Sequence, residues 1–204
     1  HVITANNNGC ISEPVVIEVI EKPVITGSIS GPDKVCLSVP YTYQISENEP
    51  GAIYVWSMHS GSGAVVGSNA GTQADFTFAS PTATIKVVKQ YVKNGVTCES
   101  DPVYFDVSQI VVTPTIINNS GLSMFCPSST YTFTADTNGI PVDHIKWEIQ
   151  PSNFGNIISG ANDGTVTVGL NEASSTLPGT LLLTVTKCNK DITYPFTINL
   201  LGNL

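Results

Sequence analysis

The sequence predicts an all-β chain of tandem β-sandwiches arranged end to end. Short runs rich in Val, Ile, Thr, Tyr and Phe alternate with clusters of Gly, Pro, Asn and Ser, which is typical of strands and turns. These runs recur with a period near 90 residues, and a fixed period indicates repeated structural units. Helical patterns are lacking: the nearest one, 171–179, is short and contains Pro178, so we expect a loop there.

The period sets the domain boundaries. Two cysteine series and one tryptophan pair recur at spacings of 88 to 91 residues: Cys10, Cys98 and Cys188; Cys36 and Cys126; Trp56 and Trp147. Residues 1–22 match only the C-terminal strands of a repeat, so we expect a truncated preceding unit there. Residues 23–109 and 110–204 are full repeats, and each has about the length of an immunoglobulin-like sandwich.

The first full repeat contains seven strand candidates in order. They are 24–29, 40–46, 52–59, 63–67, 73–78, 82–92 and 96–107. Period-2 alternation places Tyr41 and Tyr43 on one face of their strand, and Tyr54 and Trp56 on one face of theirs. The glycine-rich run 61–67 resembles a phosphate-binding loop, but no helix pattern follows it, so a hairpin turn is the preferred interpretation. Asn94-Gly95 is a further hairpin signal.

The second repeat follows the same order. Its strand candidates are 131–136, 144–149, 164–170, 179–187 and 196–201. Trp56 and Trp147 lie in the central strands, where stacking on a sugar is the alternative to burial. We expect the core of the two sandwiches to contain Trp56, Trp147, Tyr43 and Phe133. Pro23 and Pro114 occupy matching linker positions and should stiffen the joints, which predicts a rod.

Composition excludes several classes of partner. The formal net charge is −8 and all eight basic residues are lysine. A nucleic-acid-binding face needs a basic stripe, and phosphate clamps favour arginine, so we expect no nucleic acid and no anionic membrane surface as partner. No run of about 18 apolar residues exists, so no membrane insertion is expected.

The five cysteines predict disulfide bonds rather than a zinc site, because they show no Cys-x-x-Cys spacing. Pairing within repeats gives Cys36–Cys98 and Cys126–Cys188, leaves Cys10 unpaired within this sequence, and is the pairing that we favour. Pairing across the repeat boundary gives Cys10–Cys36 and Cys98–Cys126 instead. A third alternative joins Cys36 to Cys188, because the loop after the first strand and the last hairpin lie at opposite ends of such a sandwich.

No catalytic constellation is present, and we expect no enzyme. The histidines are His1, His59 and His144, none of which accompanies a Gly-x-Ser-x-Gly nucleophile motif, so surface positions are the preferred interpretation. No cofactor is expected. Two exposed aromatic candidates for a carbohydrate-binding face are Tyr91 and Tyr104.

Acidic pairs raise the question of calcium. Glu47 with Glu49, Asp136 with Asp143, and the turn 162–164 supply carboxylates. Calcium takes six to eight oxygen ligands, and the spaced Asp loop that usually provides them is missing. Ordinary turn chemistry is therefore preferred, with calcium as the alternative.

The order of these motifs resembles a known family. A Val-Cys pair, a Tyr-x-Tyr strand, a Tyr-x-Trp strand and a closing Asn-Gly-x-x-Cys-x-Ser-x-Pro hairpin are similar to the PKD-like, immunoglobulin-like repeats of large secreted surface proteins of Bacteroidota, including gliding-motility adhesins. The matched positions are Cys36, Tyr41, Tyr43, Tyr54, Trp56, Gly71, Thr72 and Cys98. The second repeat ends in KCNKDIT and lacks the Ser-x-Pro.

The resemblance implies a non-catalytic function. We expect a stalk or filament segment of a bacterial surface adhesin, secreted by the type IX route, displayed at the cell surface and related to gliding motility. Its partners would be neighbouring repeats of the same chain, with a surface glycan or protein as a further ligand. The alternative function is an accessory carbohydrate-binding or protein-interaction module of a secreted enzyme.

Overall fold

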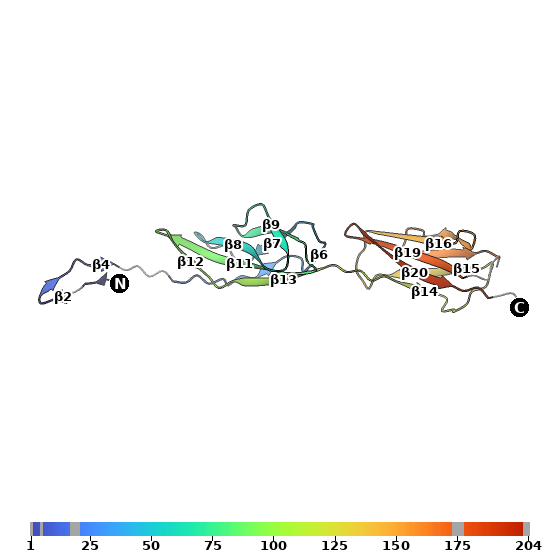
Figure 1. Cartoon of the computed structure of the whole chain (residues 1–204), viewed down its shortest axis with the longest axis horizontal. Coiled ribbons are helices and arrows are strands. Elements are labelled where there is room, and N and C mark those ends of the chain that lie inside the picture. The colour runs from blue at the N-terminus through green and yellow to red at the C-terminus, as the bar shows by residue number, and fades with distance from the viewer. Residues whose placement is uncertain (1, 5, 17–20, 173–177, 202–204) are drawn as a thin grey trace. The chain divides into compact units, whose positions relative to one another are not determined.

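The computed structural model describes residues 2–4, 6–16, 21–172 and 178–201, which form an all-β chain (Figure 1). The chain divides into two compact units, His1–Ile110 and Val111–Leu204. Among the described residues no helix could cross a membrane.

The N-terminal segment carries two short strand pairs. β1 (Val2–Ile3) pairs with β4 (Val15–Val16), and β2 (Asn6–Asn7) pairs with β3 (Cys10–Ile11). Asn8 and Gly9 form the turn with φ of 50° and 87°, the left-handed conformation that a two-residue hairpin requires.

The first sandwich consists of two sheets. One sheet has the order β5 (Ile29–Ser30), β7 (Tyr41–Ile45), β10 (Gln73–Phe78) and β9 (Gly63–Val66). The other has the order β12 (Val96–Glu99), β11 (Thr82–Lys93), β13 (Val103–Gln109) and β6 (Lys34–Val35), with β8 (Ile53–Ser60) also paired to β11. All pairs are antiparallel except β6 with β13, which is parallel.

The second sandwich repeats this plan with fewer strands. One sheet has the order β14 (Thr115–Asn118), β15 (Thr130–Asp136), β18 (Thr165–Leu170) and β17 (Gly155–Ser159). The other has the order β16 (His144–Gln150), β19 (Gly179–Lys187) and β20 (Lys190–Ile198).

Several predicted strands differ from the observed ones. The candidate 24–29 forms a strand only at Ile29. The candidate 96–107 is divided into β12 and β13, which follow one another along the same edge of β11 and are interrupted at Pro102. Proline has no amide proton to donate to the ladder, which explains the interruption. The candidate 196–201 ends at Ile198, and β14 and β17 were not predicted.

Each of the two cores contains one tryptophan, and both tryptophans form the same kind of hydrogen bond. Trp56 and Trp147 are 0% and 2% exposed. Each indole Nε1 donates to a backbone carbonyl in the loop after the next strand, at 2.8 Å to Gly71 and at 2.9 Å to Asp163. Tyr43 and Phe133, at equivalent positions in β7 and β15, are fully buried beside them. The four expected core residues therefore all lie in the interior.

In each sandwich the segment by which the chain enters and the segment by which it leaves lie side by side and run parallel. In the first sandwich the entering segment leads up to and includes β6, and the leaving segment is the end of β13. In the first, the amide of Ser108 donates to the Asp33 carbonyl and the amide of Ile110 to the Val35 carbonyl, both at 2.8 Å. In the second, Phe125 forms an isolated parallel bridge with Leu200. This feature recurs 90 residues later in the chain, so it belongs to the repeat rather than to one copy.

Candidate functional site

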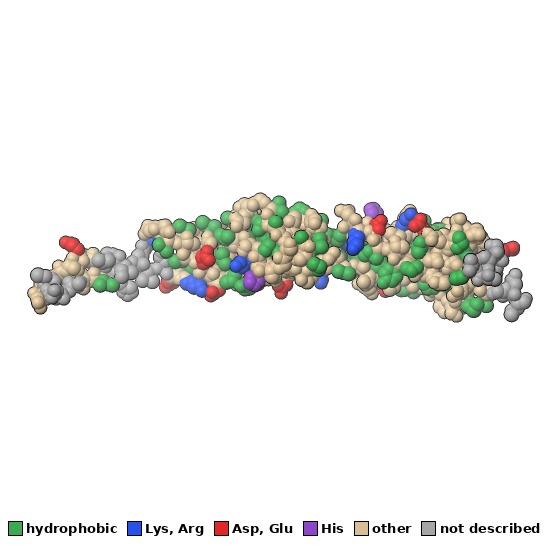
Figure 2. Space-filling view, in the orientation of Figure 1, with side chains coloured by type: hydrophobic (Ala, Val, Ile, Leu, Met, Phe, Trp, Pro, Cys, Tyr) green, Lys and Arg blue, Asp and Glu red, His purple; other side chains and the backbone are tan. Residues whose placement is uncertain are grey.

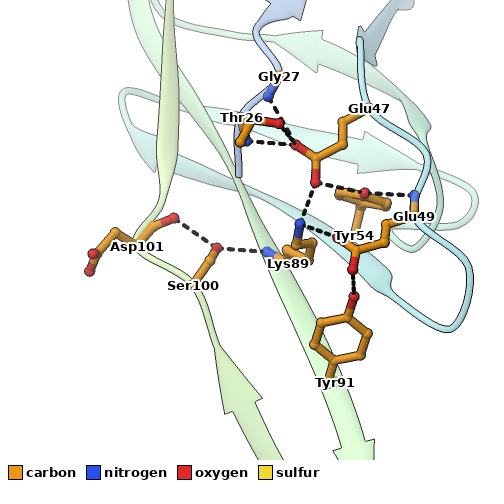
Figure 3. A network of polar contacts seen from close by, with 9 residues as sticks. All are labelled: Thr26, Gly27, Glu47, Glu49, Tyr54, Lys89, Tyr91, Ser100 and Asp101. Carbon is orange, nitrogen blue, oxygen red and sulfur yellow. Dashed lines mark hydrogen bonds and ion pairs between the residues drawn. The ribbon is translucent and has the colours of Figure 1, made fainter. Parts of the chain in front are cut away.

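The most distinctive polar feature is a buried lysine in the first sandwich. Lys89 continues the inward row of β11 after Ala83, Ile85 and Val87, and is only 3% exposed. An unpaired ammonium at such a position would be very costly, so its partners decide what the site does. Figure 3 shows Lys89 surrounded by residues from five segments of the repeat.

The first partner is Glu47, in the loop after β7. Its Oε1 accepts hydrogen bonds from the Lys89 Nζ and, at 3.1 Å, from the Tyr54 hydroxyl. Its Oε2 accepts from the backbone amides of Thr26 at 2.6 Å and Gly27 at 2.9 Å. The carboxylate thus replaces a strand partner for the segment that precedes β5, which explains why residues 24–28 do not form the predicted strand.

The second partner is Glu49, two residues further along the same loop. Its carboxylate accepts from Lys89 at 2.7 Å and from the Tyr91 hydroxyl, while its amide donates to the Tyr54 hydroxyl at 3.1 Å. Both tyrosines are therefore engaged with the loop. Tyr91, a candidate for a carbohydrate face, has its hydroxyl bound to Glu49.

Backbone contacts extend the cluster to the interruption between β12 and β13. The Lys89 amide donates to the Ser100 hydroxyl, and the Ser100 amide donates to the Lys89 carbonyl, both at 2.9 Å. The neighbouring Asp101 forms an exposed ion pair with Lys22 at 2.6 Å. We call the set Glu47, Glu49, Tyr54, Lys89, Tyr91 and Ser100 the ion cluster. It joins the entering segment and the loop after β7 to β8, to β11 and to the residue that follows β12.

Electrostatics keep both partners of the central pair charged. Burial acts to raise the pKa of Glu47, but hydrogen bonds from Lys89, Gly27 and Thr26 outweigh it and lower the pKa to about 2. Burial acts to lower the pKa of Lys89, but the hydrogen bonds and charges of Glu47 and Glu49 outweigh burial and raise this pKa above its ordinary value. A general acid or base needs a pKa near the working pH, so this pair is suited to holding structure rather than to proton transfer.

The second repeat replaces the ion cluster with apolar and neutral residues. Lys89 lies opposite Tyr54, two residues before the tryptophan of β8; the corresponding pair in the second repeat is Val185 opposite Ile145. Val185 is fully buried, and Thr137 occupies the position that corresponds to Glu47. The fold therefore does not require a buried lysine at this position; among the described residues of the second repeat, the ion pair on the corresponding strand lies two residues later, between Lys187 and Asp143 at 3.1 Å.

The observed states of the cysteines contradict the disulfide pairing that the sequence favoured. Cys36 and Cys188 are each disulfide-bonded, whereas Cys98 and Cys126 carry free thiols. The predicted pairs Cys36–Cys98 and Cys126–Cys188 are thus wrong. The side chain of Cys10 lies outside what the structure describes.

Strand registers explain why the within-repeat pairs do not form. Cys36 follows Val35, which lies beside the end of β13 that faces Thr82, the first residue of β11. Cys98 pairs with Tyr91 near the other end of β11. Nine residues of strand span roughly 30 Å, whereas disulfide-bonded Cα atoms lie within about 7 Å of each other.

The same separation holds in the second repeat. Cys126 follows Phe125, which bridges Leu200 just beyond the β20 residue paired with Gly179, the start of β19. Cys188 directly follows Lys187, the end of β19. The two cysteines of each repeat therefore lie near opposite ends of its longest strand.

The hairpin cysteines are also less equivalent than their spacing indicates. Cys188 and Asn189 are the two turn residues, with φ of 57° and 56°, as Asn94 and Gly95 are in the first repeat. Cys98 lies four residues beyond Asn94, within β12. The sequence period thus places Cys98 and Cys188 on corresponding hairpins of the two repeats, but not at corresponding positions within those hairpins.

The remaining candidates lie apart from one another. His59 and His144 are exposed, and His1 lies outside the described residues. Among the residues that the structure describes, no group of three His, Cys, Asp or Glu side chains is arranged to hold a metal ion. Glu47 and Glu49 bind Lys89, which supplies the positive charge that a calcium ion would bring there.

Other acidic candidates are engaged in turns. Asp136 accepts from the Asn138 amide at 2.8 Å, and Asp143 accepts from the Lys187 ammonium and the Cys188 amide, both at 3.1 Å. Uncharged side chains cover most of the face shown in Figure 2, with charged groups scattered among them.

Sequence reasoning did not find the ion cluster. Its signal was available in the alternation of β11, because Ile85, Val87 and Lys89 share one face while Lys86 lies on the other. The carboxylates that bind the Lys89 ammonium come from the loop after β7, and the entering segment in turn binds Glu47; the approach of neither to β11 has a sequence pattern of its own.

Comparisons with known proteins agree with this architecture. Residues 22–101 match the family model of the PKD-like domain. The chain is similar to a structure of three N-terminal domains of the Highly Immunogenic Outer Capsid protein of bacteriophage RB49, with 13% sequence identity and a TM-score of 0.54. The match covers 86% of this chain and 59% of that structure.

A further match is weaker. The C-terminal domain of the AgI/II polypeptide BspA of Streptococcus agalactiae aligns with 6% identity and a TM-score of 0.44, over 83% of this chain and 95% of that one. A search of curated proteins gives no match. Residues 22–101 are thus similar to a PKD-like domain, and the similarity to the tandem domains of the capsid protein shows an all-β, immunoglobulin-like sandwich fold.

Proposed function

We propose that this chain is a non-catalytic stalk or filament segment of an extracellular bacterial surface adhesin. The observation that carries the proposal is the parallel pairing of entering and leaving segments, found in both repeats. Tandem PKD-like and immunoglobulin-like units supply repeated folded spacers, and the resemblance to Bacteroidota surface repeats supplies the setting.

The parallel pairing determines how a repeat responds to tension. When the two chain ends of a repeat are pulled apart, the entering segment and the leaving segment are drawn past each other in opposite directions. The bonds Ser108–Asp33 and Ile110–Val35 are then loaded together in shear rather than one after another. The ion cluster adds a second attachment, because Glu47 holds the amides of Thr26 and Gly27 ahead of β6.

Single-molecule force spectroscopy tests the proposal. Ile110→Pro removes the amide that donates to Val35, at a position where the chain already leaves the strand. We expect a lower unfolding force for the first repeat and no change for the second, which serves as the internal control. An unfolding force of the first repeat that Ile110→Pro leaves unchanged would contradict the proposed mechanical role of this pairing.

The surface location remains part of the proposal. Disulfide-bonded Cys36 and Cys188 fit an oxidising compartment, as expected outside the cytoplasm. Type IX export and a part in gliding follow from the resemblance alone. Surface labelling of intact cells producing the parent protein, with and without the type IX machinery, tests both the location and the route.

A second candidate function, carbohydrate binding, is favoured by one exposed contact. Tyr104 on β13 is 49% exposed, and its ring lies 4.6 Å from that of His59 on β8, measured between ring centroids. An aromatic face open to solvent is suited to stacking on a sugar ring. Glycan-array binding that Tyr104→Ala abolishes would support this candidate over the plain stalk.

A further inference from the structure

An aromatic pair lies on the outward face of the sheet that contains β8, β11 and β13. The rings of His59 on β8 and Tyr104 on β13 approach each other to 4.6 Å between centroids, although β11 runs between their strands. The two ring planes are inclined by 57°, so the rings do not cover each other, and Tyr104 stays 49% exposed. An aromatic ring that remains open to water offers a ligand a large apolar contact.

A hollow of about 400 Å³ adjoins this pair in the first repeat. Asp106, which lines the hollow, lies two residues after Tyr104 on the same face of β13, and Ser60, which also lines it, directly follows His59. The volume is within the range of small-molecule sites in proteins. The polar residues that line the hollow are Asp33, Ser60, Thr82, Thr84, Asp106 and Ser108.

The polar groups of the hollow are suited to binding hydroxyl groups. The Thr84 hydroxyl donates to Oδ1 of Asp106 at 2.8 Å. Among the described residues no hydrogen bond reaches the other carboxylate oxygen of Asp106, so this oxygen can accept a hydrogen bond from a ligand. The Thr84 oxygen keeps a lone pair for a ligand donor, because a hydroxyl can donate and accept at the same time.

The charges around the hollow are balanced. Asp33 and Asp106 supply two carboxylates. Lys34 donates to the Ser108 hydroxyl at 2.8 Å, and Lys86 lies opposite Tyr104 in the register of β11 with β13. An anionic ligand would meet two carboxylates and a cationic ligand would meet two ammonium groups, and like charges at short range repel. A neutral ligand rich in hydroxyl groups avoids both penalties.

We propose that this face binds a neutral sugar residue, with the apolar side of the sugar ring stacked on Tyr104 beside His59 and a hydroxyl at the edge of the ring donating to Asp106. Alternate residues of a strand lie about 7 Å apart, a span that one sugar ring with its hydroxyl groups covers. The inference rests on the carbohydrate-binding candidate described above, and it adds the class of sugar and the polar half of the site.

Two other Thr–Asp pairs in the chain lack the aromatic neighbour. Thr42 donates to Asp75 across β7 and β10, and Thr186 donates to Asp191 across β19 and β20, both at 2.6 Å. The same-face neighbours along the strand are Gln73 and Thr77 for Asp75, and Thr193 for Asp191. Asp75→Ala therefore removes the same kind of polar contact without touching the proposed site.

The test is calorimetric titration of the 204-residue chain with defined oligosaccharides. The neutral probes are hexasaccharides of glucose, mannose, galactose and N-acetylglucosamine, and the charged probe is hexagalacturonate. We expect at least one neutral probe to bind, with an affinity that added salt leaves unchanged because no ion pair forms with the ligand, and we expect hexagalacturonate not to bind.

Variants then locate the site. Tyr104→Ala and Asp106→Ala should each weaken binding by about tenfold or more, since one removes the stacking surface and the other a hydrogen bond to a charged group. Tyr104→Phe keeps the ring and should retain binding. Asp75→Ala, and Tyr194→Ala at an exposed tyrosine of β20, should leave the affinity unchanged. Circular dichroism of every variant checks that it remains folded.

Three results would overturn the inference. They are no binding of any neutral probe, preferential binding of hexagalacturonate, and binding that Tyr104→Ala or Asp106→Ala leaves unchanged. Preferential binding of hexagalacturonate that Tyr104→Ala abolishes would refute the neutral class while the carbohydrate-binding candidate stands. Absence of binding to all probes would count against both, and would leave the stalk proposal to force spectroscopy, which measures resistance to tension and not binding.

Discussion

Removing the Lys89 ammonium should destabilise the first repeat and leave the second unchanged. The informative substitution is Lys89→Val, because valine occupies the corresponding buried position, Val185, in the second repeat. The side chain of Glu47 is 12% exposed, so its carboxylate would remain largely buried without its cation. Breaking a buried ion pair from one side costs roughly 3–5 kcal/mol.

The pKa of Glu47 gives an independent magnitude. Its pKa is lowered from the ordinary value of 4.5 to about 2 by all its donors together. Each unit corresponds to about 1.4 kcal/mol, so the charged carboxylate stabilises the fold by roughly 3 kcal/mol. Thr26, Gly27 and Tyr54 keep donating after Lys89→Val, so we expect a loss near the lower end, about 3 kcal/mol. For a domain of this size that lowers the Tm by roughly 10–20 °C.

The measurement is a thermal melt followed by tryptophan fluorescence in a Trp147→Phe background, in which Trp56 is the one remaining tryptophan and reports the first repeat. Lys86→Met is the matched control, because Lys86 lies three residues earlier on the outward face of the same strand. Surface changes of this kind alter stability by no more than about 0.5 kcal/mol.

A second substitution separates loss of the charge partner from loss of packing. Glu47→Thr added to Lys89→Val recreates the residues of the second repeat and removes the uncompensated carboxylate. We expect the double variant to regain most of the lost stability, since apolar replacements of buried ion pairs are often neutral. The argument for the ion cluster is wrong if Lys89→Val has the same melting temperature as Lys86→Met. It is also wrong if the double variant loses more unfolding free energy than the sum of the losses of the two single variants.

Three further predictions follow. Because the folded-state pKa of Glu47 is depressed, its contribution is complete above about pH 4.5 and is lost as the pH falls toward 2, so acid melts of wild type and Glu47→Gln should converge at pH 2 and differ at pH 7. Trp56→Ala should cost roughly 3–5 kcal/mol, because it empties a fully buried site and orphans the Gly71 carbonyl, and an unchanged chemical denaturation midpoint would contradict the core position. Iodoacetamide without reductant should label Cys98 and Cys126, as peptide mass spectrometry would show; labelling of Cys36 would contradict the oxidation states.

Much of the fold could be predicted because strand alternation and turn chemistry are local. The rows Tyr41–Tyr43 and Tyr54–Trp56 give the inward faces directly, and Asn94-Gly95 gives the hairpin, since its left-handed turn is encoded by two adjacent residues. The interruption at Pro102 was also visible in the sequence, because Glu99, Ser100 and Asp101 precede a residue that has no amide proton for the ladder. The local sequence pattern thus predicts which residues are buried more reliably than it predicts where the strands end.

The disulfides and the ion cluster could not be predicted for a different reason. Equal spacing of Cys36–Cys98 and Cys126–Cys188 is a statement about repetition, and it holds whether the two sulfur atoms are adjacent or a strand length apart. Only the registers of β11 and β19 decide between these cases. In the same way, Glu47 and Lys89 lie 42 residues apart in the chain and meet through the path of a loop.

The contrast between the repeats indicates what the ion cluster contributes. The second sandwich builds the same β16–β19 contact with Ile145 and Val185, so apolar packing suffices for the fold. What that packing does not supply is a fixed acceptor for the amides of an entering segment. Glu47 supplies two such bonds at Thr26 and Gly27. The buried lysine, which keeps Glu47 charged, therefore serves the attachment of the chain that enters the first repeat, and under the proposed stalk function this attachment would carry load.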